Sequence, residues 1–324
     1  MIHLRVAGTG RYLPDEVIPN SYFAGRDLRR YDSLGCIVGV VRKNESEIFK
    51  VTGIRERRKS PQGQTSADMG YEAASMAIER AGIDVDSLVG IIVGTVTEDV
   101  NFPSAACKIQ ERLGARNCFA YDISNACASF PEALAQANAR VLRKHGNYLV
   151  VSAENMLGMV DSNDINSTLF GNGAGAAVLV PTEGPEGIVA EYSFSNPFDG
   201  GLNLIFRDPE RFCRMPEGDL VFKRAVKSMI TASESLKSDA KWDRADVYIP
   251  HQANGRIVDL VESKVREEGC VVFRTVEKYG NMSGATVAVA LDEAIEQNVI
   301  NSGKRVILVS FGSGLVTSGV AIQF

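Results

Sequence analysis

The stretch that decides the fold class runs from residue 119 to residue 153 and reads FAYDISNACASFPEALAQANARVLRKHGNYLVVSA. It predicts a strand, a turn of small residues, an amphipathic helix and then a buried apolar strand. The same alternation extends over the chain. Strands are predicted at 89–94, 148–153, 176–180, 246–250 and 305–310, and helices at 66–82 and 220–238. This order indicates an α/β fold of βαβ-type units, with mixed sheets covered by helices.

The two halves of the chain carry the same spacing. The strand IIVG ends at Gly94, and Cys127 in NACAS follows 33 residues later (127 − 94 = 33). The strand DVYIP ends at Pro250, and Ser283 in NMSGA also follows 33 residues later (283 − 250 = 33). A helical pattern and a buried strand come next in both, which predicts a duplicated unit packed as one layered body. The predicted halves are 1–183 and 184–324.

The bulk composition excludes several classes of protein. No run of about eighteen apolar residues is present, so no membrane span is predicted. The N-terminus lacks the basic start and long apolar run of a signal peptide, so a cytoplasmic location is expected. A net charge of −5 argues against nucleic acid as a partner. The six cysteines show no zinc-like spacing, so free thiols and no metal site are expected.

Cys127 is the candidate nucleophile. It lies where a predicted strand turns into a helix, and free N–H groups at a helix start favour a thiolate. We therefore expect a lowered pKa for this thiol. The small neighbours Ala126, Ala128 and Ser129 would let an acyl group approach closely. From this context alone, a buried structural cysteine is an equally good interpretation.

His251 is the second candidate, because the chain has only three histidines. It follows the end of a buried strand, where α/β sheets bind ligands. Asn281 begins a helix of small apolar residues, whose first turn therefore faces the interior. Asn254, three residues after His251, could cap a helix or hold a loop. Each of these residues also has a purely structural interpretation.

Two glycine clusters remain. FGNGAGAAVLV at 170–180 precedes a predicted strand instead of following one, which disfavours a dinucleotide cofactor and favours close backbone packing. The second cluster, FGSG at 311–314, follows a strand, and its turn could direct backbone N–H groups at a ligand oxygen.

Together these motifs resemble the β-ketoacyl-[acyl-carrier-protein] synthase III family of the thiolase superfamily. NACASF, FGNGAGAAVL, PHQAN, GNMSGAT with ALDEA, and FGSG occur in that family's order and spacing. The upstream segments GTGRYLP, TGIRERR and FPSAACKIQ match as well, so the resemblance covers nearly the whole chain. It implies a five-layered thiolase-like fold.

The resemblance implies a catalytic trio of Cys127, His251 and Asn281. Cys127 would take an acyl group from a thioester as a covalent intermediate. The backbone N–H groups of Cys127 and Ser313 would form the oxyanion hole. His251 and Asn281 would bind the malonyl thioester carbonyl and stabilise the enolate made when CO2 leaves. That carbanion would attack the acyl-cysteine and give a 3-oxoacyl thioester.

The resemblance also implies the surroundings of this trio. Phe311 would lie beside the leaving carboxylate, Asn254 would support the site, and Phe102 would reach into the acyl pocket of a neighbouring subunit in a homodimer. Acyl-CoA or acyl-carrier protein would be a substrate, and no resident cofactor is expected. An acyl carrier protein would be the protein partner, with Lys223, Arg256 and Lys264 at the positions that the family uses for docking. An ordinary solvated face is the alternative for these cations.

The histidine and cysteine counts discriminate within the superfamily. Elongating synthases use two histidines with the cysteine, and thiolases need a second cysteine in the C-terminal glycine loop, which here reads Gly312-Ser313-Gly314. Two alternatives to condensation stay open. One is acyl transfer from Cys127 to an alcohol or amine, and the other is a non-catalytic scaffold.

The chain departs from the family at the coenzyme A clamp. The segment 21–50 is about a dozen residues longer than the resemblance leads us to expect. Glu47 falls where the family places a tryptophan, and Asp164 falls near its partner arginine. Two carboxylates would repel the nucleotide phosphates, so we expect weak or altered coenzyme A recognition. Alternatively, the longer loop supplies its own clamp through residues such as Tyr31, Arg42 or Lys43.

Overall fold

Two five-stranded sheets form the frame of the protein, in a computed structural model that describes residues 2–98, 100–198, 200–210 and 212–324. The first sheet has the order β1-β9-β8-β6-β7, and the second has the order β10-β16-β15-β13-β14. The strands of the first are β1 (His3–Tyr12), β6 (Leu88–Gly94), β7 (Phe119–Ile123), β8 (Asn147–Asn155) and β9 (Asn172–Thr182). Those of the second are β10 (Gly187–Ser195), β13 (Val247–Pro250), β14 (Val271–Val272), β15 (Arg305–Gly312) and β16 (Val316–Gln323).

The two sheets repeat each other strand by strand. β1 pairs antiparallel with β9, and β9 antiparallel with β8, while β8, β6 and β7 run parallel. The second sheet has the same pattern, with β10, β16 and β15 antiparallel and β15, β13 and β14 parallel. The first sheet uses residues 3–182 and the second uses residues 187–323. The duplicated unit predicted from the spacing is therefore present.

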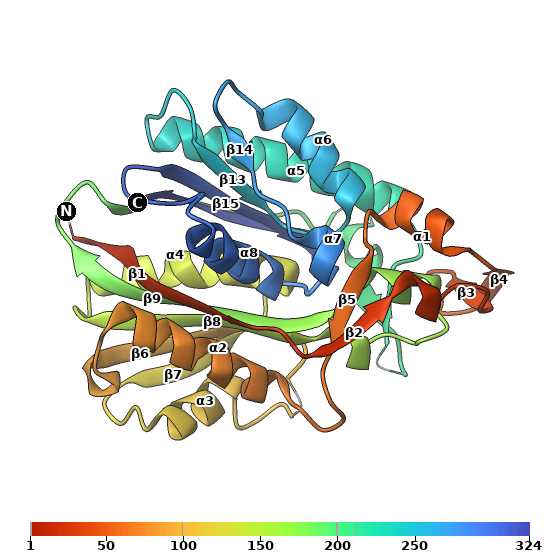
Figure 1. Cartoon of the computed structure of the whole chain (residues 1–324), viewed down its shortest axis with the longest axis horizontal. Helices are drawn as coiled ribbons and strands as arrows, with labels where there is room; N and C mark the ends of the chain where they lie inside the picture. Colours follow the sequence, from red (N-terminus) through yellow and green to blue (C-terminus); the bar gives the residue numbers. More distant parts are fainter. Residues whose placement is uncertain (1, 99, 199, 211) are drawn as a thin grey trace.

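Helices fill three layers around the two sheets (Figure 1). On the outer face of the first sheet lie α2 (Ser66–Ala81) and α3 (Ala105–Leu113). Between the sheets lie α4 (Ser129–Val141) and α8 (Ala285–Glu296), and on the outer face of the second lie α5 (Gly218–Asp239) and α6 (Gly255–Val265). The predicted five-layered α/β fold is confirmed.

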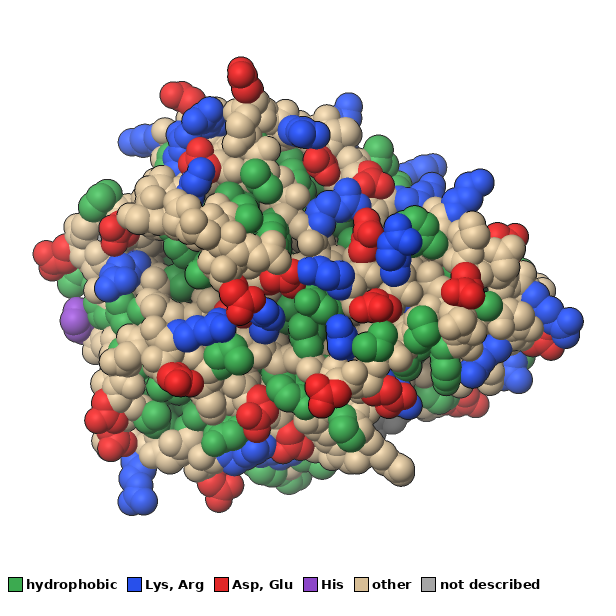
Figure 2. Space-filling model, viewed as in Figure 1, with side chains coloured by type: hydrophobic (Ala, Val, Ile, Leu, Met, Phe, Trp, Pro, Cys, Tyr) green, Lys and Arg blue, Asp and Glu red, His purple; other side chains and the backbone are tan. Residues whose placement is uncertain are grey.

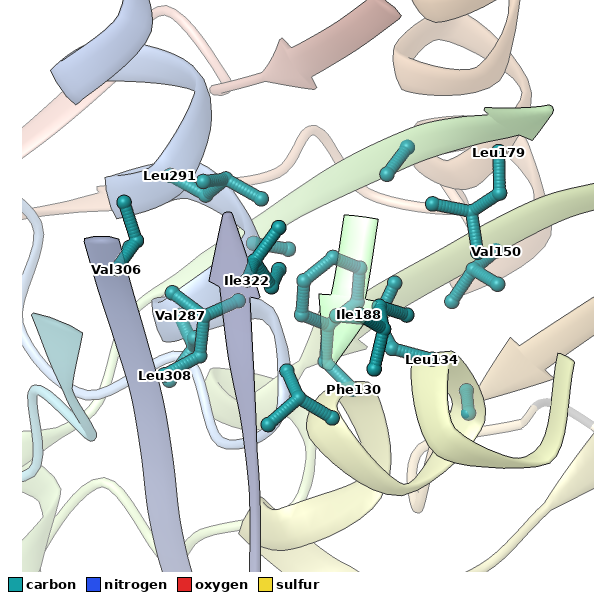
Figure 3. Packing of buried hydrophobic residues seen from close by; sticks show 14 of the residues in the cluster. Phe130, Leu134, Val150, Leu179, Ile188, Val287, Leu291, Val306, Leu308 and Ile322 are labelled. Atoms are coloured by element: carbon teal, nitrogen blue, oxygen red, sulfur yellow. The ribbon is translucent and has the colours of Figure 1, made fainter. Parts of the chain in front are cut away.

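The central layer forms the core of the molecule. The first ten residues of α8 are all buried, so this helix is enclosed by both sheets and α4. Phe130 and Leu134 of α4 meet Val287 and Leu291 of α8 within one apolar cluster, to which both sheets contribute (Figure 3). Cys127 begins the connection into α4 and Asn281 the connection into α8. Both residues therefore lie at the entry to the two buried central helices.

The glycine cluster at 170–175 corrects one detail of the prediction. It was expected to precede the strand, but β9 begins at Asn172, so Gly173 and Gly175 lie within it. The predicted reason for the glycines, close backbone packing, is confirmed. A Cβ on Gly175 would lie 2.7 Å from the backbone carbonyl carbon of Ala288 in α8.

The remaining elements extend the frame at one end. They comprise β2 (Glu16–Pro19), β3 (Leu28–Tyr31), β4 (Ile37–Val41), α1 (Glu45–Thr52), β5 (Glu56–Lys59), β11 (Phe206–Arg207), β12 (Cys213–Arg214) and α7 (Val276–Tyr279). β3 and β4 form a hairpin that projects beyond α1 (Figure 1). Cations and carboxylates are interspersed over the face seen in Figure 2. Among the described residues, no helix combines the length and the apolar character needed to cross a membrane.

Candidate active site

One cavity of about 540 Å³ brings the three candidate catalytic residues together. Cys127, His251 and Asn281 all line it, although they are far apart in sequence and come from both halves. Cys127 follows β7, His251 follows β13 and Asn281 precedes α8. The strand ends and helix starts of the two repeats thus meet at one place, as ligand sites in α/β folds do.

The turn that carries Cys127 is fixed by contacts to the second sheet. Cys127 lies in a short 3-10 turn that leads directly into α4, as predicted. The Ser310 hydroxyl of β15 donates to the Cys127 carbonyl oxygen at 2.5 Å. A Cβ on Gly312 would lie 2.7 Å from the Cys127 backbone nitrogen, so only glycine allows this approach. The C-terminal glycine turn therefore lies against the amide of the nucleophile.

The predicted lowering of the Cys127 pKa is not found. Burial raises the pKa of this thiol to about 11, although the Ser283 hydroxyl beside it lowers the value. Desolvation disfavours the thiolate more than the helix start favours it. The thiol is therefore protonated at neutral pH, and acyl transfer needs a group that accepts its proton.

His251 is a buried, neutral imidazole. Only 2% of its surface is exposed, and burial lowers its pKa to about 3. Its Nδ1 lies 2.6 Å from the Thr286 hydroxyl of α8, which also lies 2.9 Å from the Ser283 carbonyl oxygen. Since Thr286 occupies Nδ1, Nε2 is the ring nitrogen left to meet a ligand in the cavity.

Asn281 is held on both its backbone and its side chain. Its backbone N–H donates to the Leu169 carbonyl, and its carbonyl accepts from Gly171. Its side-chain Oδ1 accepts from the Ser283 backbone N–H at 2.8 Å. That contact orients the amide, so its NH2 group is the part able to donate to a ligand in the cavity.

The structure brings most of the other predicted site residues to the same cavity. Ser313, Phe311 and Asn254 all line it. Asn254 performs both tasks that the sequence left open, because its side chain accepts from the Arg256 N–H at the start of α6 and donates to the Val51 carbonyl of α1. Phe102 is not among the lining residues of this chain, and 83% of its surface is exposed.

The predicted docking cations lie on α5 and α6, both of which contribute lining residues to the cavity. Phe222 of α5 lines the cavity, and the Arg256 guanidinium of α6 lies 5.4 Å from the centre of its ring. Lys223 is the next residue on α5 and is exposed. Lys264, two turns further along α6, is also exposed. The three cations therefore share the outer layer formed by α5 and α6.

The two carboxylates at the expected coenzyme A clamp have structural partners. Glu47 caps α1 through a reciprocal pair of hydrogen bonds with Asn44. Asp164 is fully buried and pairs with the Arg214 guanidinium at 3.0 Å. The repulsion expected from Asp164 is therefore largely offset by an adjacent cation. Neither carboxylate lines the cavity.

The longer segment 21–50 folds into the hairpin β3–β4 and the helix α1. The Tyr31 ring at the end of β3 stacks on Arg214, with the guanidinium carbon 3.7 Å from the ring centre, and its hydroxyl donates to Asp161. Arg42 pairs with Asp27 on the surface. Tyr31, which the sequence suggested as a replacement for the coenzyme A clamp, is thus already stacked on Arg214.

Two buried polar residues at the site were missed by the sequence reasoning. Thr286 contacts His251 across the helix start, and Glu154 at the end of β8 lies close enough to Cys127 to raise its pKa. A sequence signal existed for Glu154, since a carboxylate follows directly on the apolar run YLVVSA. Thr286 offered none, because a threonine in a small-residue helix is common.

The fold and this cavity identify the protein as a condensing acyltransferase of the thiolase superfamily. The family model described as "3-Oxoacyl-[acyl-carrier-protein (ACP)] synthase III" matches residues 121–197, and the model of its C-terminal part matches residues 237–324. A β-ketoacyl-[acyl-carrier-protein] synthase III of Natranaerobius thermophilus is 35% identical, and the alignment covers 100% of both chains. The chain belongs to the β-ketoacyl-[acyl-carrier-protein] synthase III family.

Solved structures agree with this assignment. The 3-oxoacyl-[acyl-carrier-protein] synthase III of Aquifex aeolicus superposes with a TM-score of 0.89 and 32% identity, covering 99% of this chain and 100% of that one. The priming β-ketosynthase of the R1128 polyketide pathway superposes with a TM-score of 0.88 and 31% identity, covering 99% of this chain and 96% of that one.

Proposed function

We propose that the protein catalyses the decarboxylative Claisen condensation of an acyl thioester with malonyl-acyl carrier protein. The product is a 3-oxoacyl-acyl carrier protein, made in fatty acid biosynthesis or a related pathway. One observation carries this proposal, which is that Cys127, His251 and Asn281 line a single cavity. A buried neutral histidine beside an amide NH2 group favours condensation over simple transfer to an alcohol or amine, because such transfer requires no enolate to be stabilised.

In the first half-reaction Cys127 attacks the carbonyl carbon of the acyl donor. The backbone N–H groups of Cys127 and Ser313 would hold the developing oxyanion. The close approach of Gly312 to the Cys127 nitrogen supports this role, because it places the glycine turn beside that amide. The donor's thiol leaves, and the acyl group stays on the cysteine.

In the second half-reaction the malonyl thioester carbonyl lies between His251 and Asn281. In the tautomer that carries its proton on Nε2, the ring can donate to that carbonyl together with the Asn281 NH2 group. The Thr286 hydroxyl, which donates to the Ser283 carbonyl in this structure, would then turn to donate to Nδ1. As CO2 leaves beside Phe311, negative charge moves onto the carbonyl oxygen and both donors bind it more strongly. The enolate carbon then attacks the acyl-cysteine. Every step uses the chain's own groups and the two thioesters, so the proposed mechanism requires no resident cofactor.

The lining of the cavity supports an acyl donor longer than acetyl. Met156, Met159, Phe170 and Cys213 pack as one small apolar cluster and line it, with Met229 of α5 also in the lining. Methionine side chains adapt to a flexible chain, and each buried CH2 contributes about 0.8 kcal/mol, roughly a fourfold gain per carbon. Rates of Cys127 acylation should therefore rise along a series of linear donors from two carbons upward, and a maximum at acetyl would contradict this preference.

A carrier-bound donor fits the outer part of the site better than plain acetyl-CoA. The Tyr31 ring is stacked on Arg214, and Asp164 is paired with that same guanidinium, so neither group is available to sandwich a nucleobase. Lys223, Arg256 and Lys264 would instead receive an acidic acyl carrier protein. Single-turnover acylation tests this choice. If micromolar acetyl-CoA loads Cys127 as fast as acetyl-acyl carrier protein does, the preference is wrong.

The assembly and location follow from the sequence and remain predictions. A homodimer would place Phe102 of each chain in the partner's acyl pocket, and its 83% exposure in the single chain leaves the ring available for that contact. Light scattering measures the mass in solution, and Phe102→Asp should shift a dimer towards monomer. A cytoplasmic location and the two halves 1–183 and 184–324 are likewise proposed.

The function itself is tested by incubating the protein with an acyl donor and malonyl-acyl carrier protein. Release of CO2 that depends on the acyl donor, together with a 3-oxoacyl product on the carrier, supports condensation. An acyl adduct on Cys127 that is discharged to an alcohol or amine without CO2 would support the alternative transfer reaction.

A further inference from the structure

A carboxyl group that the mechanism above does not use is buried beside the nucleophile. Glu154 is fully buried near the end of β8. One oxygen, Oε2, accepts from the Thr97 hydroxyl at 2.6 Å and from the Thr95 hydroxyl and Val96 N–H at 3.2 Å each. The other oxygen, Oε1, has no hydrogen-bond partner among the described residues. A buried carboxyl with one unpaired oxygen lowers the stability of the fold, which points to a functional role for that oxygen.

The Ser283 hydroxyl connects this carboxyl to the Cys127 thiol. Ser283 Oγ is also buried and lacks a full hydrogen bond within the described chain. Burial raises the pKa of Glu154 to about 7, and Ser283 is among the neighbours that lower it. Burial raises the pKa of Cys127, with Ser283 lowering it and the Glu154 charge raising it further. Ser283 therefore lies beside both groups, although its hydroxyl does not reach full hydrogen-bond geometry with either.

Few other groups can accept the thiol proton. Among the described lining residues, His251 and Glu98 are the other groups able to accept a proton. Burial lowers the His251 pKa to about 3, which makes this ring a weak base. The groups that face the Glu154 carboxyl are the Thr95 and Thr97 hydroxyls, the Val96 N–H, Ser283 and the Cys127 thiol. Of these, only the thiol is a proton donor that the reaction must deprotonate.

Building on the proposed acyl-cysteine chemistry, we propose that Glu154 is the base that accepts the Cys127 proton, with the Ser283 hydroxyl as the bridge. As the Sγ–H bond breaks, its proton moves to Ser283 Oγ and the hydroxyl proton moves to Glu154 Oε1. The sulfur lone pair forms the new bond to the acyl carbon, and the donor's C–S bond breaks with its electron pair on the leaving sulfur. That thiolate takes up a proton from Glu154, which restores the carboxylate.

This role has a pH signature that a merely structural carboxyl lacks. The wild-type rate of Cys127 acylation should rise about tenfold per pH unit below a value near 7, where Glu154 ionises, and level off above it. Acetyl-N-acetylcysteamine is a suitable donor, because it carries no titrating phosphate or carrier. The rate is measured in single turnover by intact-protein mass spectrometry between pH 5.5 and 9.

Three variants and one control make the test specific. Glu154→Gln should lose the inflection and slow acylation at pH 8 by about 10² to 10⁴-fold, the range for general-base catalysis. Ser283→Ala should slow acylation at least about tenfold and keep the carboxyl. Thr97→Val removes a hydrogen bond that lowers the Glu154 pKa, so the inflection should move to higher pH. Asp292→Asn changes another fully buried carboxyl, paired with Arg11 and Arg80 away from the cavity, and should keep the inflection.

The outcomes separate this proposal from the function on which it rests. If wild-type Cys127 is not acylated by any donor, the acyl-cysteine function fails. If the wild type is acylated and folded Glu154→Gln keeps both the rate and the inflection, the proton role of Glu154 is overturned. If circular dichroism shows that Glu154→Gln is unfolded, the other two variants decide. An unmoved inflection in Thr97→Val with a wild-type rate in Ser283→Ala then overturns the proposal.

Discussion

The two halves of the molecule share one frame and carry different chemistry. Their sheets have the same strand order and the same pattern of parallel and antiparallel pairs. Yet the turn that enters α4 holds a cysteine, whereas the equivalent turn that enters α8 holds Asn281 and Ser283. The turn after β13 adds His251. We infer that the duplicated frame fixes where side chains meet. The acylated cysteine comes from the first half and the proposed decarboxylation residues His251 and Asn281 come from the second, while Ser283 and Ser313 of the second half would assist acylation.

The largest expected effect comes from the first half. Cys127→Ala removes the atom that bonds to the acyl group, so condensation should fall by at least about 10⁴-fold. The fold should survive, because the lost sulfur faces the cavity and the backbone contact from Ser310 remains. Product formation measures the first outcome and circular dichroism the second. Full condensation activity in this variant would refute the assignment.

The second half should give the next largest losses. His251→Ala or Asn281→Ala removes one donor to the enolate oxygen, which costs about 10² to 10³-fold in condensation. CO2 release from malonyl-acyl carrier protein measures this loss. Because the His251 pKa is about 3, the ring is neutral throughout the working range. The pH profile of wild-type decarboxylation should therefore show no inflection from His251 above pH 5. A His251-dependent inflection near pH 6.5 would mean that the ring acts as a titrating base instead.

A smaller loss of decarboxylation is expected from changing Thr286, which contacts His251 and does not itself contact the substrate. Thr286→Val removes the hydroxyl that contacts His251 Nδ1, so the imidazole loses the partner that orients its ring. Decarboxylation should fall about tenfold, corresponding to one lost hydrogen bond, and acylation should not change. Thr286→Ser keeps the hydroxyl and serves as the matched control. Equal losses in both variants would assign the effect to packing against the core.

The smallest effect is expected at the rim. Lys223→Glu with Arg256→Glu should raise the apparent KM for carrier-bound substrate about threefold to tenfold and reduce its salt dependence, since exposed charges act mainly on association. The kcat should stay near the wild-type value, because neither side chain reaches the three catalytic candidates. Unchanged kinetics at low salt would show that these cations form an ordinary solvated face.

Much of the fold could be predicted because it rests on local patterns, whereas local patterns only nominated Cys127, His251 and Asn281, and the family resemblance joined them into a trio. Apolar periodicity marked the strands and helices, and the repeated spacing of Cys127 and Ser283 marked the duplication. His251 and Asn281 stood at a strand end and a helix start, where side chains reach a cavity. The candidate residues were therefore those whose flanking sequence predicts a turn.

What the sequence could not supply depends on contacts between distant segments. The pairing of Asp164 with Arg214 joins residues 50 positions apart, so an expected free carboxylate became half of an ion pair. The Cys127 pKa followed burial and a charge from Glu154, which no local pattern reveals. The extra length of segment 21–50 could be recognised from the sequence, but its fold could not be predicted. Its Tyr31 ring is placed by a guanidinium that lies far along the chain.

The assignment of His251 and Asn281 to decarboxylation is tested most directly by intact-protein mass spectrometry of His251→Ala and Asn281→Ala. Each variant is incubated with an acyl donor and malonyl-acyl carrier protein, and the mass of the enzyme is followed over time. We predict that both variants acquire one acyl group on Cys127 and hold it, with CO2 release slowed about 10² to 10³-fold, whereas the wild type turns over. Unmodified Cys127 in both variants would contradict the account, because it would place His251 and Asn281 in the acylation step.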